Sequence, residues 1–222
     1  MTSDCLYIAA KPPVPGQVKT RLARGIGAGA SARLYAGFLE DLAADVRDSG
    51  VAAGWFIPPG AWVPPSLGPH QLMTRRQVGR SWSERQAGLF EARHRDGHPA
   101  TVLIASDSPQ LRMTEVGAQL REWRAELVLA PVHDGGYYLF GMRGNHDVLR
   151  GVEMSTADVS AEIARRAAEL QLELHLLPVQ FDVDEVEDLA PLAAAAAVLP
   201  HLRATRRALA KIGAGAVLAV TR

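Results

Sequence analysis

Cys5-Leu6-Tyr7-Ile8-Ala9-Ala10 is a short, almost wholly apolar run, and Lys11-Pro12-Pro13-Val14-Pro15-Gly16 follows it directly. The run is typical of a buried β-strand. It ends abruptly, because proline lacks the backbone N–H that a strand or helix interior needs, and a Pro/Gly cluster continues neither element. The stretch therefore predicts a strand that opens into a stiff loop, as in the first unit of an α/β fold.

The remaining sequence alternates between helix-like and strand-like segments. Apolar residues recur at three- and four-residue steps over 31–48, which predicts an amphipathic helix, and Ser81-Trp82-Ser83-Glu84 spells a capping box for a helix ending near Arg95. Further strands are predicted at 55–57, 72–74, 101–105, 127–132 and 172–177, and further helices at 115–124, at 157–170 after a cap at Thr156, and within 186–212. This alternation predicts an α/β fold: a three-layer α/β/α architecture with a mainly parallel, Rossmann-like sheet.

Composition narrows the class of protein. With 222 residues, 48% of them hydrophobic, the chain is expected to form one domain, residues 1–222, with a well-filled core. Its 24 Lys and Arg balance 24 Asp and Glu, so we expect no nucleic-acid and no membrane partner. One cysteine excludes an intrachain disulfide, and neither a signal-like start nor a membrane-length apolar run is present, so we expect a cytoplasmic protein.

The first loop carries three cations, Lys11, Lys19 and Arg21. Because its prolines restrict the unbound loop, these cations could hold an anion at little cost in ordering. Val18 breaks the Gly-x4-Gly-Lys-Ser/Thr spacing, which excludes a P-loop. A surface loop with solvated cations is the alternative.

Two acidic segments also follow predicted strands, at the sheet edge where ligands bind in parallel α/β folds. Asp107, in Ser106-Asp107-Ser108-Pro109, could bind a hard cation or could only cap a turn. Asp182 and Asp184 point the same way if their segment is extended, and two such carboxylates repel unless water or a cation neutralises them.

A Gly-rich turn, Asp134-Gly135-Gly136, leads into Tyr137 and Tyr138. Paired glycines let the backbone approach a ligand closely, or they simply turn a corner. A tyrosine here could stack on a base or sugar, although an aromatic run on a strand is more often part of a core.

The order of these motifs, Lys-x-Pro-x-Pro-Gly-x-Val-Lys-Thr-Arg-Leu, Ser-Glu-Arg, Ser-Asp-Ser-Pro, Asp-Gly-Gly-Tyr and Asp-Val-Asp, resembles a bacterial family of predicted glycosyltransferases. Its members have the GT-A-type nucleotide-diphospho-sugar transferase fold, and some are associated with arsenosugar or selenium-related genes. More distantly, the chain is similar to guanylyltransferases of molybdenum-cofactor and deazaflavin-cofactor (2-phospholactate) synthesis. The resemblance covers about 11–189.

The resemblance implies roles for residues at matching positions. Asp107 would bind Mg²⁺ or Mn²⁺, with Asp182 or Asp184 as its partner across the site. The catalytic residues would be Lys19, Arg21 and Asp107. The nucleotide-binding set would be Lys11, Pro15, Gly16, Lys19, Thr20, Arg21 and Arg85, and the acceptor or sugar pocket would be formed by Asp134, Gly135, Gly136 and Tyr137.

Three functions remain open on the residues. The first is glycosyl transfer from a nucleotide sugar to a small-molecule acceptor, which the family resemblance favours. The second is nucleotidyl transfer from an NTP with release of pyrophosphate. It is favoured by Asp107-Ser108-Pro109, which has one acidic residue where glycosyltransferases of this fold commonly have an Asp-x-Asp motif. The third is a non-catalytic nucleotide-binding module. Trp62 and the apolar stretch 216–220 are candidate contact surfaces for a homodimer.

Overall fold

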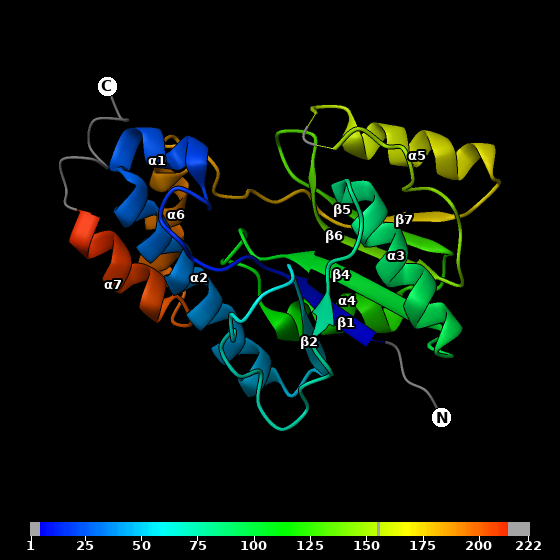
Figure 1. Ribbon diagram of the computed structural model, residues 1–222, viewed down its shortest axis with the longest axis horizontal. Helices are drawn as coiled ribbons and strands as arrows, with labels where there is room; N and C mark the ends of the chain where they lie inside the picture. Colours follow the sequence, from blue (N-terminus) through cyan, green and yellow to red (C-terminus); the bar gives the residue numbers. More distant parts are fainter. Residues whose placement is uncertain (1–4, 155, 213–222) are drawn as a thin grey trace.

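A computed structural model describes residues 5–154 and 156–212 of the chain, and within these residues seven strands form one sheet in the order β3-β2-β1-β4-β6-β5-β7 (Figure 1). The strands are β1 Cys5–Ala9, β2 Ala53–Ile57, β3 Arg75–Arg76, β4 Ala100–Ala105, β5 Leu127–Pro131, β6 Tyr137–Arg143 and β7 Leu174–Leu176. The helices are α1 Thr20–Ile26, α2 Ala28–Ser49, α3 Trp82–Arg95, α4 Met113–Glu122, α5 Val159–Glu169, α6 Leu189–Val198 and α7 Arg203–Ile212.

The sheet is mainly parallel, as the alternation of elements predicts. β1 pairs in parallel with both β2 and β4, and β5 pairs in parallel with β7. The exception is β6, which runs antiparallel to β4 and β5. The connection from β5 to β6, residues 132–136, is too short for the crossover that a parallel pair requires, so the chain turns back on itself there.

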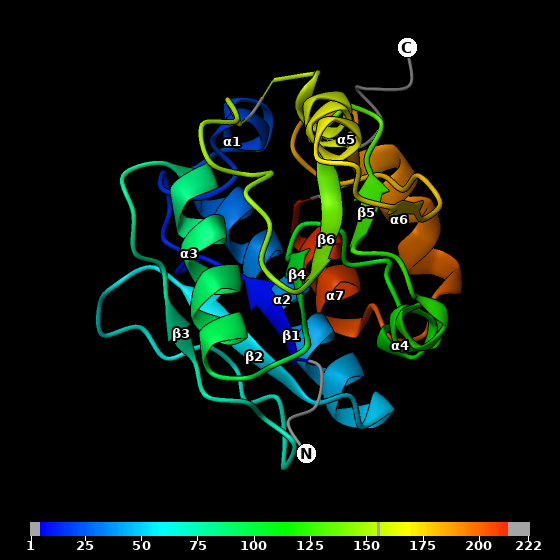
Figure 2. The same ribbon diagram turned by 90° about the vertical axis from the view of Figure 1, so that its right-hand side faces the viewer.

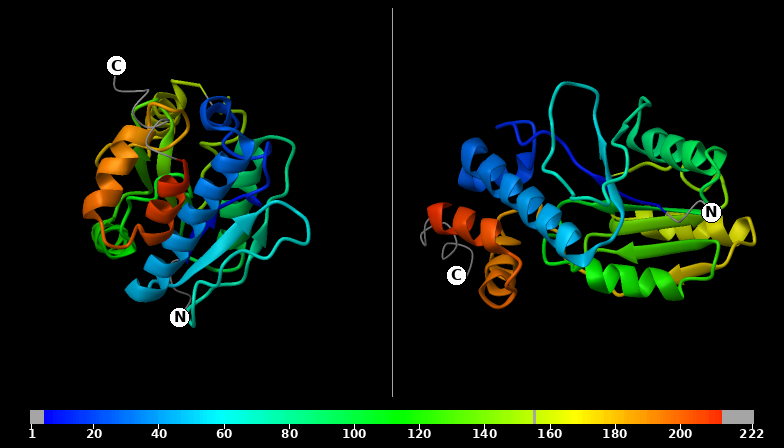
Figure 3. Two further views of the ribbon diagram at one scale, coloured as in Figure 1. Left: turned by 90° about the vertical axis from the view of Figure 1, so that its left-hand side faces the viewer. Right: turned by 90° about the horizontal axis from the view of Figure 1, so that it is seen from below.

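Helices cover both faces of the sheet and complete the three predicted layers. Buried side chains of α2, α4 and α6 pack in one apolar cluster, and those of α3 and α5 pack in a second one on the opposite face. Figure 2 shows α3 on one side of the strands and α4 and α6 on the other, and Figure 3 shows α3 and α4 separated by the sheet. Trp62, a candidate contact residue, is partly buried against the first cluster, and 216–220 lie outside the described residues.

Helix α2 also anchors two other helices through buried carboxylates. Asp41 accepts hydrogen bonds from the backbone N–H groups of Ala204 and Thr205, at 2.7 Å each, at the start of α7. Asp45 accepts one from the N–H of Met113, at 2.6 Å, at the start of α4. Both aspartates therefore satisfy N–H groups that a helix start leaves without a partner.

The structure contains the predicted elements, but several of their bounds differ by two or three residues, as at the start of α2 and at both ends of α4. Ser81 caps α3 as predicted, and its Oγ accepts from the N–H of Glu84 at 3.2 Å. Strand β3 lies at 75–76 instead of 72–74, and α5 begins after Asp158 instead of Thr156. Helix α1 was not among the predicted elements, because only seven residues separate the loop from Gly27, too few to show a helical period.

Within the described residues no helix is long and apolar enough to cross a membrane.

Candidate functional site

A cavity of about 760 Å³ lies at the carboxyl ends of β1 and β4, where their loops meet the segment around 182–184. The sequence-predicted residues that line it are Lys11, Lys19, Thr20, Arg21, Arg85, Asp107, Asp134, Gly136, Tyr137, Asp182 and Asp184. Three predicted residues, Pro15, Gly16 and Gly135, do not line it. The topology therefore gathers residues from across the chain at one edge of the sheet, as expected for parallel strands.

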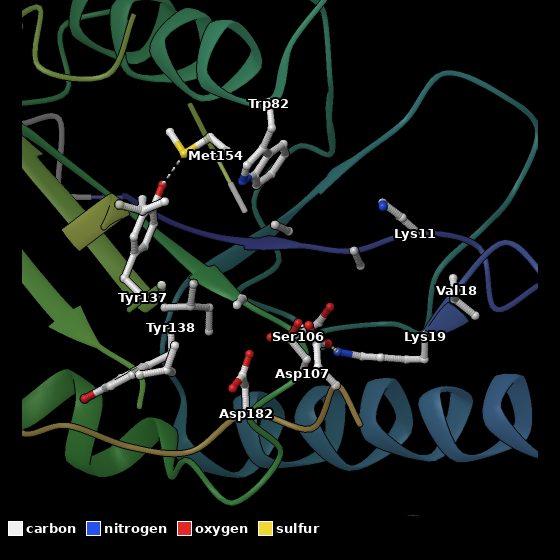
Figure 4. A pocket seen from close by; sticks show the side chains of 18 of the residues that line it. Lys11, Val18, Lys19, Trp82, Ser106, Asp107, Tyr137, Tyr138, Met154 and Asp182 are labelled. Atoms are coloured by element: carbon white, nitrogen blue, oxygen red, sulfur yellow. Dashed lines mark hydrogen bonds and ion pairs between the residues drawn. The ribbon is translucent and has the colours of Figure 1, made fainter. Parts of the chain in front are cut away.

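Lys19 lies at the centre of the acidic part of this cavity (Figure 4). Its Nζ donates to Asp107 Oδ2 at 2.9 Å and to Asp184 Oδ1 at 2.6 Å, and its side chain is only 7% exposed. Asp182 belongs to the same group, since one carboxylate oxygen from each of the three aspartates lies within 4.8 Å of the others. The reading of Asp107 as only a turn cap does not account for this arrangement.

The charges of this cluster perturb one another. Burial lowers the pKa of the Lys19 ammonium, but the carboxylates of Asp107 and Asp184 outweigh it, so the net pKa lies above its ordinary value. Burial likewise raises the pKa of Asp184, and Lys19 more than offsets it, so that pKa lies below its ordinary value. For Asp182, burial and then the neighbouring Asp107 and Asp184 carboxylates raise the pKa to about 7.

The three carboxylates fit a hard divalent cation. Mg²⁺ and Mn²⁺ prefer oxygen ligands, and each of the three aspartates offers one such oxygen at mutual distances that a single ion can bridge. Burial first, and then the neighbouring carboxylates, raise the pKa of Asp182, so its ionised form needs further positive charge. A dication would supply that charge.

Backbone contacts hold the two acidic segments together. The N–H of Val183 donates to the carbonyl of Asp107 at 3.0 Å, and Gln110 Nε2 donates to the carbonyl of Phe181 at 2.6 Å. Asp107 and the residues on either side of Val183 are therefore held in register, although they are far apart in the sequence.

Helix α2 supports the cationic loop through two side chains that sequence reasoning missed. Tyr35 Oη lies 2.8 Å from Ser106 Oγ and accepts from the N–H of Lys11 at 3.2 Å. Ser31 Oγ donates to the carbonyl of Lys19 at 2.9 Å, where the backbone of Lys19 is left-handed with φ 47°. The helical period of α2 assigns Tyr35 only to a core-facing stripe, so no local signal distinguishes it from an ordinary core residue.

A second part of the cavity, which we call the neutral lobe, is defined by Trp82, Gln86, Tyr137 and Met154. Tyr137 Oη donates to Gln86 Oε1 at 2.9 Å, and burial raises the pKa of the phenol, so it stays protonated. Figure 4 shows Trp82, Met154 and Tyr137 well away from Lys19 and Asp107. The cavity thus combines a charged region with an uncharged one that has aromatic faces.

Gly135, Arg85 and Arg21 have separate roles in the geometry. A Cβ on Gly135, where φ is +88°, would lie 1.8 Å from the carbonyl oxygen of Ala157, so this glycine permits close packing of the segment before α5. Arg85 lines the cavity and donates to the carbonyl of Gly79 at 3.0 Å. Arg21 is 47% exposed, and its guanidinium lies 3.8 Å from Asp184.

Comparison with known proteins places this geometry in context. Residues 51–156 match a family model described as an uncharacterized protein conserved in bacteria (DUF2064). A solved structure described as a "putative nucleotide-diphospho-sugar transferase", from Desulfovibrio desulfuricans G20, is 28% identical with a TM-score of 0.87, over 99% of each chain. A cytidylyltransferase from Leptospira borgpetersenii serovar Hardjo-bovis (strain JB197) shares the fold at 12% identity, with a TM-score of 0.51 over 96% of this chain and 94% of that one. A search among curated proteins finds no match.

The full-length similarity and the family match agree with the order of motifs in the sequence. The resemblance is therefore confirmed: the chain is similar in fold to a nucleotide-diphospho-sugar transferase-like protein, and its residues 51–156 match the DUF2064 family model.

Proposed function

We propose that this protein is a metal-dependent, nucleotide-using transferase that moves a sugar from a nucleotide-sugar donor to a small-molecule acceptor. The observation that carries the proposal is the cluster of Asp107, Asp182 and Asp184 around Lys19, at the carboxyl ends of the strands and inside a cavity of about 760 Å³. The similarity, over 99% of each chain, to the structure described as a "putative nucleotide-diphospho-sugar transferase" supports a nucleotide-dependent transferase.

The cations of the first loop are suited to the diphosphate of such a donor. Lys19, Arg21 and Lys11 all line the cavity beside the carboxylates, so a diphosphate bound there would meet three positive charges. Mg²⁺ or Mn²⁺ held by the three aspartates would neutralise the diphosphate and the charge that develops on it. Lys11, Lys19 and Arg21 would stabilise the nucleoside diphosphate as it leaves, while the acceptor attacks the anomeric carbon and the sugar–phosphate bond breaks.

The neutral lobe is suited to the uncharged part of the reaction. Trp82 and Tyr137 offer apolar faces to a ring. The four side chains that define the lobe are uncharged, so a neutral ligand bound among them leaves none of their groups as an unpaired charge. We assign the transferred sugar or the acceptor to this lobe, with Asp134 and Gly136 at its edge.

A substrate panel tests the proposal. Calorimetric titration with UDP-sugars, GDP-sugars and GTP, each with and without Mg²⁺ or Mn²⁺, is followed by assays for released nucleoside diphosphate and pyrophosphate. We expect metal-dependent binding and release of a nucleoside diphosphate. Pyrophosphate release from GTP would instead establish nucleotidyl transfer, and metal-independent binding without turnover would establish a non-catalytic module.

Asp107→Asn tests the site itself. We expect it to abolish metal-dependent nucleotide binding, because the variant loses a charged metal ligand and also one partner of Lys19. Asp147→Asn is the matched control, since Asp147 is 70% exposed and does not line the cavity. Normal turnover by Asp107→Asn would show that the metal site is misassigned.

A further inference from the structure

Lys19 is paired with two of the three carboxylates that a metal ion would need. Its Nζ is 2.9 Å from Asp107 Oδ2 and 2.6 Å from Asp184 Oδ1, and these two residues belong to the three-carboxylate group. A divalent ion binds carboxylate oxygen at about 2.0–2.6 Å. An ammonium and a dication cannot both occupy the space between one pair of carboxylates, because they would repel each other at contact distance.

Hydrogen bonds tie the backbone of the cluster on both sides of the ion pairs. The carbonyl of Asp107 is tied to the N–H of Val183, which holds the acidic segments together. The backbone of Lys19 is tied through its carbonyl to Ser31 Oγ at 2.9 Å. A flexible side chain of four methylenes is therefore the part of the cluster that can yield to an ion.

We infer that Lys19 is a placeholder cation that keeps the site closed to a free metal ion, and that the metal enters together with the polyphosphate of the substrate. The inference rests on the proposed function and specifies the form of its substrate as a metal–nucleoside diphosphate complex.

The cost of leaving a buried charge unpaired favours entry of the metal together with the polyphosphate. Moving the ammonium of Lys19 away from both carboxylates without a new partner would leave a nearly buried charge unpaired, which is strongly unfavourable. A free ion brings no anion for Lys19. A diphosphate does, because it presents oxygens that can accept from the ammonium while the metal takes over the carboxylates.

Manganese binding without nucleotide tests the inference, measured by calorimetry or by the electron paramagnetic resonance of free Mn²⁺. Lys19→Met keeps most of the side-chain length and removes the charge. We expect it to bind Mn²⁺ about tenfold or more tightly than the wild type, because a unit positive charge has left the site. Lys19→Arg retains the charge and should retain the weak binding.

Lys211→Met is the matched control, because it removes the same charge from an exposed position in α7 that does not line the cavity. We expect little change in its affinity for Mn²⁺ alone. A second measurement needs no variant: inorganic pyrophosphate, which carries a diphosphate without base or sugar, should convert weak Mn²⁺ binding by the wild type into tight binding and raise its melting temperature.

The outcomes separate the two claims. If Lys19→Met binds Mn²⁺ no more tightly than the wild type, or if the wild type alone binds Mn²⁺ as tightly as it does with pyrophosphate, the placeholder role is refuted. If Lys19→Met gains affinity for Mn²⁺ but the wild type neither binds nor turns over any nucleotide in the substrate panel, the placeholder role stands and the proposed function fails.

Discussion

Asp182→Asn should stabilise the metal-free protein at alkaline pH, although it removes a residue of the site. Burial and the carboxylates of Asp107 and Asp184 raise the pKa of Asp182 to about 7. The unfolded value is about 3.9, so the charged form is disfavoured in the folded state. Protonated Asp182 therefore contributes to the free energy of unfolding. This contribution is fully present below about pH 4 and is lost as the pH rises through about 7.

The size of the effect follows from this shift. A change from about 3.9 to about 7 is roughly 3 pKa units, or about 4 kcal/mol at 1.36 kcal/mol per unit. Asp182 is only half-buried, and water screens part of that cost, so we expect on the order of 1–2 kcal/mol. For a chain of this length that corresponds to roughly 2–8 °C in melting temperature.

Calorimetric melting in EDTA across pH 4 to 8.5 measures the stability of Asp182→Asn against that of the wild type. We expect the difference between Asp182→Asn and the wild type to grow from about pH 4 to about pH 7 and then to level off. Addition of Mn²⁺ with pyrophosphate should stabilise the wild type and not the variant. Asp147→Asn, at an exposed carboxylate outside the cavity, should show neither effect. An Asp182→Asn protein that melts below the wild type at pH 8 without metal would refute the account of this cluster.

Two further substitutions test the support of the site. Tyr35→Phe removes the hydroxyl that contacts Ser106 and the N–H of Lys11. We expect the free energy of unfolding to fall by about 1 kcal/mol and nucleotide binding to weaken. Unchanged nucleotide binding would show that α2 does not position the loop. Gly135→Ala places a methyl group against the carbonyl of Ala157 at a left-handed φ, so urea unfolding should show a loss of about 2 kcal/mol or more, whereas wild-type stability would contradict the packing described.

Much of the architecture can be predicted from the sequence because its signals are local. The apolar run before Lys11 and the alternation of helical and strand periods predict strands, layers and a mainly parallel sheet. The capping box at Ser81 predicts the start of α3 to the residue, because one side chain and one nearby N–H make the contact. Charged residues after strands predict which loops form the site, because parallel strands end at one edge.

Only the tertiary structure decides how those residues meet. Lys19 lies 88 residues from Asp107 and 165 from Asp184, and no local period encodes that contact. The sequence leaves open which of Asp182 and Asp184 lies beside Asp107. In the folded chain, packing places a carboxylate oxygen of each within 4.8 Å of one from Asp107. The support from Tyr35 and the packing role of Gly135 likewise depend on elements distant in the chain. Local propensity determines the elements, whereas burial and long-range charge pairing determine the site.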